Sequence, residues 1–125
     1  MDTHPLLIVD GANVVGSRPD GWWHDRAGAA ARLRDRLVPV ADTGVPPELP
    51  APVEVVLVVE GAARDVPGVA GVRTVAAPGS GDDTIVDLVR AAADRRRLVV
   101  TADRELRGRV GELGAEVYGP RWLPS

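Results

Sequence analysis

Short apolar runs of strand length alternate along this chain with longer amphipathic stretches. The apolar runs are continuous rather than alternating with polar residues, which is typical of strands in a sheet that is covered on both faces. They predict five strands, at residues 5–9, 53–59, 71–76, 97–101 and 115–118.

Between these runs, apolar residues recur at helical spacing in three stretches, residues 25–37, 82–94 and 103–113. The second stretch follows the i, i+3, i+4, i+7 template most closely. Gly114 is expected to end the third helix. The predicted buried stripes are Ala27, Ala30, Leu33 and Leu37 in the first helix, Ile85, Leu88, Val89 and Ala92 in the second, and Leu106, Val110 and Leu113 in the third.

Two segments have no such pattern. Residues 38–52 contain five prolines and are expected to form a loop without regular structure, and residues 61–71 form a second irregular connection. The order β-α-β-β-α-β-α-β predicts a three-layer α/β domain with a mostly parallel five-stranded sheet. We expect a single domain over residues 1–125, with its core at about residues 5–119.

Composition removes several classes of protein. The chain has 125 residues, 45% of them hydrophobic, and fifteen arginines without a lysine or a cysteine. The absence of cysteine excludes a disulfide scaffold, a thiolate nucleophile and a cysteine-type zinc site. The apolar runs are too short to span a bilayer, and no basic segment precedes the first of them. We therefore expect a soluble, cytoplasmic protein, whose net charge of −3 argues against binding phosphate by bulk charge alone.

Acidic residues stand where predicted strands end and helices begin. Asp10 directly follows the first strand, Asp82 and Asp83 open the second helix, and Asp103 lies two residues past the fourth strand. Ligand sites in parallel sheets lie at the carboxyl ends of the strands, at the topological switch point. If the first and fourth strands are neighbours, these carboxylates converge and need a compensating cation. Oxygen ligands without histidine or cysteine favour Mg²⁺ or Mn²⁺, which would activate water and neutralise a phosphodiester.

Helical phase separates the paired aspartates. Asp82 lies closer to the apolar stripe of its helix and is expected to face the sheet edge as a metal ligand. Asp83 lies on the outer face and is expected to act through a water molecule or on the substrate side.

Each acidic residue also has an ordinary interpretation. The segment from Ser80 to Asp83 fits a capping box, and Asp103 can be a helix cap. Asp10 and Gly11 can form a turn, with Asn13 in a left-handed conformation. The joint placement of three acidic positions at one edge favours the metal site.

Aromatic and basic residues add further candidates. Trp22 and Trp23 can stack on a splayed base or pack a loop over the sheet edge, and packing is favoured. Arg95–Arg97 precedes its strand, opposite the predicted site, and is interpreted as a solvated cap at a helix carboxyl end. Arg104, beside Asp103, is better placed to bind a phosphate.

Three segments in register resemble the PIN-like nuclease superfamily, and within it the NYN branch that includes the YacP-like proteins. The resemblance extends from about Pro5 to Tyr118. The segments are Ile8-Val-Asp10-Gly-Ala-Asn13-Val, Gly79-Ser-Gly-Asp82-Asp83-Thr-Ile85-Val and Val100-Thr-Ala-Asp103-Arg-Glu-Leu.

This resemblance implies a Rossmann-like PIN-type domain that hydrolyses RNA phosphodiester bonds as a metal-dependent endoribonuclease. It implies catalytic and metal-binding roles for Asp10, Asp82 and Asp103. The motif positions further imply that Asn13 assists as the nearby amide and that Thr101 is the hydroxyl on the substrate side.

The chain departs from the family in its middle. PIN nucleases often carry another acidic residue on a helix there, where this sequence has its proline-rich segment. Glu60, at the end of the second strand, can substitute for it or can be a solvated strand-end residue. This thinner acidic set supports an alternative function, a noncatalytic RNA-binding or adaptor module on the same fold.

Overall fold

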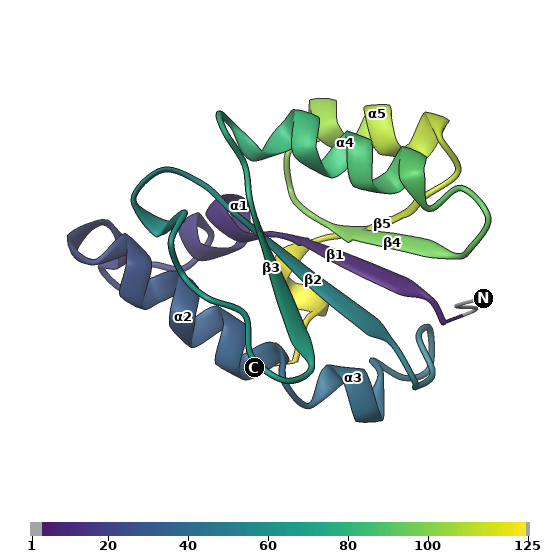
Figure 1. Cartoon of the computed structure of the whole chain (residues 1–125), viewed down its shortest axis with the longest axis horizontal. Coiled ribbons are helices and arrows are strands. Elements are labelled where there is room, and N and C mark those ends of the chain that lie inside the picture. The colour runs from purple at the N-terminus through teal and green to yellow at the C-terminus, as the bar shows by residue number, and fades with distance from the viewer. Residues whose placement is uncertain (1–3, 125) are drawn as a thin grey trace.

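The computed structural model describes residues 4–124 and contains one sheet with helices on both faces (Figure 1). All of its strand pairs are parallel, and the strand order is β3-β2-β1-β4-β5. The fold expected from the sequence is therefore confirmed, with a sheet that is fully parallel. The strands are β1 (Leu6–Asp10), β2 (Glu54–Val59), β3 (Val72–Ala76), β4 (Arg97–Val100) and β5 (Glu116–Tyr118).

The helices divide between the two faces of the sheet. Helices α1, α2 and α3 lie on one face, and α4 and α5 lie on the other (Figure 1). Two short 3-10 turns, η1 (Trp22–His24) and η2 (Gly61–Ala63), lie between these elements, and a third, η3 (Pro120–Trp122), follows β5. The helices are α1 (Gly11–Gly16), α2 (Arg26–Leu37), α3 (Val40–Thr43), α4 (Gly81–Ala91) and α5 (Arg104–Glu112).

The strand β1 shows why its apolar run is continuous. Leu7 and Val9 belong to the core cluster under α2, whereas Leu6 and Ile8 belong to the cluster under α4 and α5. Successive strand residues point to opposite faces, so a sheet covered on both sides requires apolar residues at every position.

The switch point of the sheet lies between β1 and β4. From β1 the chain continues to β2 and β3 on one side, and it returns through α4 to β4 on the other side of β1. In the register, Val9 pairs with Val100 and Asp10 pairs with Val58. The carboxyl ends of β1, β2 and β4 therefore lie side by side, where α/β sheets bind their ligands.

The proline-rich segment is more ordered than we expected. It contains α3 and a two-residue bridge in which Val45 and Leu49 exchange backbone hydrogen bonds of 2.7 and 2.9 Å. Pro39 stands just before α3, where a missing N–H costs little. The buried side chains of Val40 and Leu49 hold the segment against the core.

The segment after β1 is a helix rather than the expected turn. Asp10 is the N-cap of α1, and Asn13 lies within this helix. Glycines are the only residues with positive φ in the described part of the chain, so the alternative interpretation that puts Asn13 in a left-handed conformation is wrong. A Cβ atom at Gly11 would lie 2.5 Å from the carbonyl oxygen of Val58. The absence of a side chain lets α1 approach β2 this closely.

The buried helix faces differ slightly from the predicted stripes. In α2, Ala29 is buried and Ala27 is exposed, and in α4, Val86 is buried while Leu88 is only partly buried. A helix that packs on a sheet covers a face wider than one narrow stripe, and the tertiary contacts choose its direction. Gly114 follows α5 with φ of +91°, as expected of a helix stop.

The arginine run before β4 is not a solvated cap. Arg97 is 8% exposed and donates from Nη1 to the carbonyl oxygen of Val89 in α4 at 2.9 Å. Arg95 donates to Glu54 at the start of β2, at 2.8 Å. A parallel sheet gathers the amino ends of its strands, and this brings acidic partners that lie far away in the sequence.

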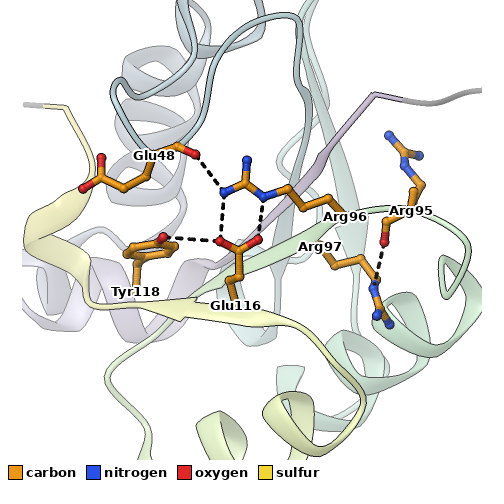
Figure 2. Close-up of polar contacts among 6 residues, drawn as sticks. All are labelled: Glu48, Arg95, Arg96, Arg97, Glu116 and Tyr118. Atoms are coloured by element: carbon orange, nitrogen blue, oxygen red, sulfur yellow. Dashed lines mark hydrogen bonds and ion pairs between the residues drawn. The ribbon is translucent and has the colours of Figure 1, made fainter.

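Arg96 extends the same network to the edge of the sheet (Figure 2). Its Nε and Nη2 atoms donate to the two carboxylate oxygens of Glu116 in β5, and the bond from Nη2 is 2.8 Å long. Nη2 also donates to the carbonyl oxygen of Glu48 at 2.7 Å. The Tyr118 hydroxyl lies 3.4 Å from the same carboxylate. This network lies at the amino edge of the sheet, as predicted, and has a structural role there.

Within residues 4–124, no helix is both long enough and apolar enough to cross a membrane.

Candidate active site

Asp10 is a buried carboxylate at the carboxyl end of β1. It is 4% exposed, and its Oδ2 accepts a hydrogen bond of 2.9 Å from the Thr101 hydroxyl. The Asn13 backbone N–H donates to Oδ1 at 3.5 Å. Burial raises the pKa of Asp10 to about 6 against the effect of these two hydrogen bonds, and the nearby charges of Asp82 and Glu60 raise it further. Asp10 is therefore a group whose charge is poorly compensated by the protein.

Thr101 and Asn13 join β1 to the segment that follows β4. The Thr101 hydroxyl accepts a hydrogen bond of 3.1 Å from the Asp103 N–H, in addition to its bond with Asp10. The Asn13 side-chain oxygen accepts one of 2.8 Å from the Ala102 N–H. Thr101 has no exposed surface, and its hydroxyl is bonded to Asp10. Its expected role on the substrate side stays a prediction.

Asp82 lies in the first turn of α4 and is half-buried, as helical phase predicted. Burial is the largest cause of its raised pKa, and the charge of Asp103 adds to it. Glu105 and Asp83 raise this pKa further, while Arg109 lowers it. Asp82 thus lies within electrostatic reach of both Asp10 and Asp103.

Glu60 belongs to the same edge. A Cβ atom at Gly81 would lie 3.3 Å from Glu60 Oε1 and 3.9 Å from Asp10 Oδ1, so both carboxylates approach the start of α4. The sequence is compatible with two roles for Glu60, a functional residue or a solvated strand-end residue. The structure places it beside Asp10, half-buried at the end of β2.

Asp83 has a different surrounding from Asp82. Its side chain is 84% exposed, and Oδ1 accepts a 3.0 Å bond from Arg109 in α5. The sequence does not predict this contact, because it depends on how α4 and α5 pack against each other in the tertiary structure. The capping box expected here is incomplete, since the Ser80 side chain makes no capping hydrogen bond.

Asp103 is the N-cap of α5. Its Oδ1 accepts a 3.0 Å hydrogen bond from the Leu106 N–H, so the capping interpretation holds for this residue. Arg104 follows as the first residue of α5 and is exposed. Asp103 can serve both roles, because a capping carboxylate has a second oxygen.

The donor chemistry of this edge fits a hard divalent cation. All its candidate ligands are carboxylate or amide oxygens, and burial together with neighbouring carboxylates raises the pKa values of Asp10 and Asp82. However, residues 4–124 hold no group of three or more histidine, cysteine, aspartate or glutamate side chains that could hold a metal ion. The sharing of one ion by Asp10, Asp82 and Asp103 therefore stays a prediction. Mg²⁺ is commonly held by one or two carboxylates with water completing its shell, and Asp10 with Asp82 suits that arrangement.

A cavity of about 250 Å³ adjoins the site on the side of β2. Gly11, Glu60 and Trp22 contribute to its wall, and the Arg26 guanidinium lies 5.4 Å from the centre of the Trp22 ring. Trp22 is partly buried, whereas Trp23 is 55% exposed and meets Trp22 edge to face. The favoured packing interpretation suits Trp22, and Trp23 retains a free surface.

The five-stranded parallel sheet, with helices on both faces, defines a Rossmann-type α/β fold of the PIN-like kind. Among solved structures, it is similar to a crystal structure of Rae1 (YacP) from Bacillus subtilis. The TM-score is 0.68 and the sequence identity is 18%, over 94% of this chain and 70% of that chain. No model of a known protein family matches the sequence, and no curated protein matches it. The likeness establishes the fold, and membership of the YacP-like branch stays a prediction.

Proposed function

We propose that this protein is an endoribonuclease that hydrolyses RNA phosphodiester bonds with a divalent cation, Mg²⁺ or Mn²⁺. The observation that carries the proposal is the buried Asp10 carboxylate, with its raised pKa, at the switch point of a PIN-like sheet beside Asp82 and Glu60. Uncompensated carboxylates at a ligand-binding edge support a catalytic role better than a structural one.

Asp10 and Asp82 would hold the cation, and Asp103 would reach it through a water molecule. When bound, such an ion lowers the pKa of a coordinated water and neutralises charge on the phosphate. Thr101 and the Asn13 N–H fix the orientation of Asp10 through their hydrogen bonds. The exposed Arg104 guanidinium would bind a phosphate of the same strand. We expect no covalent intermediate on the protein.

The test is cleavage of labelled single-stranded and structured RNA in Mn²⁺, Mg²⁺ or EDTA. We expect cleavage to need the metal and to fall about 100-fold or more in Asp10→Asn and Asp82→Asn. Asp87→Asn is the matched control, since Asp87 is an exposed aspartate of the same helix as Asp82. Cleavage that persists in EDTA or in both site variants would contradict the proposal.

A noncatalytic RNA-binding module on the same fold is the second candidate. It is favoured by the lack of a ready three-residue ligand group in the described part of the chain. RNA binding without cleavage in any metal would support this alternative.

A further inference from the structure

A cavity of about 400 Å³ lies between the end of α1 and α2. Val14 and Leu33 form part of its apolar lining. Three arginines also line it: Arg18, which follows α1, and Arg32 and Arg36 from successive turns of α2. We call this cavity the arginine pocket. The cavity is thus lined by three of the fifteen arginines of the chain.

The acidic residues of the arginine pocket do not balance its positive charge. Only Asp20 and Asp35 contribute carboxylates to its lining. Asp35 already accepts a 3.0 Å hydrogen bond from Arg34, a residue outside the lining. The pocket therefore carries an excess of positive charge.

Arg36 is the partly buried member of the three arginines. Its Nε atom is buried and has no hydrogen-bond partner among residues 4–124. Burial lowers the pKa of Arg36, and the charge of Arg18 lowers it further against the attraction of Asp20. An anion between the Arg18 and Arg36 guanidiniums would relieve this repulsion.

We propose that the arginine pocket binds a phosphate group of the RNA strand whose cleavage is proposed above. Arginine presents paired N–H donors that match phosphate oxygens, which makes it the preferred residue for such contacts. The inference rests on the proposed function only for the identity of the strand. The phosphate chemistry follows from the pocket itself.

The position of the pocket suits a strand that continues from the active site. Asp10 caps the amino end of α1, and Arg18 lies just beyond its carboxyl end. At about 1.5 Å per residue, the eight residues from Asp10 to Arg18 span on the order of 12 Å. A bound strand would therefore place one phosphate at the carboxylate edge and another, a short distance along, in the pocket.

The test measures the affinity of a labelled single-stranded RNA in EDTA, so that no cleavage is required. Arg18→Gln and Arg32→Gln change exposed residues and should fold normally, and Arg36→Gln removes the buried donor. We expect each change to weaken binding about tenfold and to reduce the salt dependence, by about 0.7 in the slope of log K against log salt concentration. Arg90→Gln is the matched control, because Arg90 is exposed on the other face of the sheet.

Unchanged affinity and salt slope in Arg18→Gln and Arg32→Gln would overturn the link to RNA. Inorganic phosphate, measured by its effect on the thermal unfolding of wild-type and variant protein, distinguishes a free anion as the ligand. If phosphate stabilises the wild type but not Arg36→Gln, the pocket is a phosphate site, and without this difference it is not. Because binding is measured without metal, weakened binding in the variants would support the pocket even if the protein cleaves no RNA.

Discussion

At the scale of single residues, Asp10 combines a structural cost with a chemical role. Its pKa in the folded protein is about 6, whereas the ordinary value is 3.8. The folded state therefore binds the proton more tightly than the unfolded state does. The stability contributed by this protonation is fully present below pH of about 4 and is lost as the pH rises through about 6. Ionised Asp10 destabilises the fold by about 3 kcal/mol at neutral pH, which is a cost that a bound cation would offset.

We expect Asp10→Asn to raise the free energy of unfolding at pH 7.5 by up to about 3 kcal/mol, because asparagine carries no charge to desolvate. The gain should shrink as the pH falls from about 6 to about 4, where Asp10 of the wild type becomes protonated. Urea denaturation at several pH values measures both quantities. A gain that is independent of pH would contradict the raised pKa.

Thr101 permits a second prediction at this scale. Thr101→Val keeps the shape of the side chain but leaves the Asp103 N–H and the buried Asp10 oxygen without a partner. We expect a loss of about 1–3 kcal/mol in stability, together with a further rise of the Asp10 pKa. Thr101→Ser retains the hydroxyl and is the control. Equal stability of the two variants would show that the hydroxyl does not hold Asp10.

At the scale of elements, helix α1 depends on one close approach. Gly11 lies against the Val58 carbonyl oxygen of β2, and this contact directs the short helix that Asp10 caps. The same helix carries Asn13 to the segment after β4, where its side-chain oxygen accepts from Ala102. The local geometry of the site is thus tied to the seating of α1 on the sheet.

Gly11→Ala should destabilise the protein by at least about 2 kcal/mol, since a Cβ atom 2.5 Å from a backbone oxygen forces the helix to shift. Gly108→Ala in α5 is the matched change, because a Cβ there meets nothing within 4 Å. We expect this control to stabilise the protein by up to about 1 kcal/mol through helix propensity. Thermal unfolding of both variants provides the comparison, and losses of similar size would refute the role of the close approach.

At the scale of the whole molecule, negative charge gathers at the carboxyl edge of the sheet and positive charge gathers in the arginine pocket and at the amino edge. The amino-edge arginines form ion pairs with Glu54 and Glu116. At the carboxyl edge, burial and neighbouring carboxylates raise the pKa values of Asp10 and Asp82. A bound divalent cation would change the net charge from −3 to about −1 and would reverse the local sign where a phosphate binds.

Mn²⁺ or Mg²⁺ should therefore stabilise the folded protein, by about 2.7 kcal/mol when the free cation is at 100 times its Kd. Asp10→Asn should lose this effect, while Asp87→Asn should retain it. The melting temperature in EDTA and in increasing Mn²⁺ measures the difference. An equal shift in the wild type and in Asp10→Asn would place the cation elsewhere.

Local periodicity was sufficient for the five strands, for helices α2, α4 and α5, and for the choice between neighbouring aspartates. The continuous apolar runs predicted all five strands, and the helical phase of Asp82 and Asp83 correctly assigned the inner and outer positions. Both features follow from the regular side-chain period of helices and strands, which a short segment of sequence shows without its neighbours. The sequence did not predict helix α1 (Gly11–Gly16), because this helix depends on the close contact of Gly11 with the neighbouring strand β2.

The sequence by itself determined the layered α/β architecture and the edge at which acidic residues gather. Only the tertiary structure decided that Glu60 lies beside Asp10, that Arg97 is buried against α4, and that Arg18 and Arg36 meet in one cavity. Each of these pairings joins residues that are far apart in the chain or on different elements. Strand order and helix packing determine the distances between such residues. The spacing of residues along the sequence does not specify either of them.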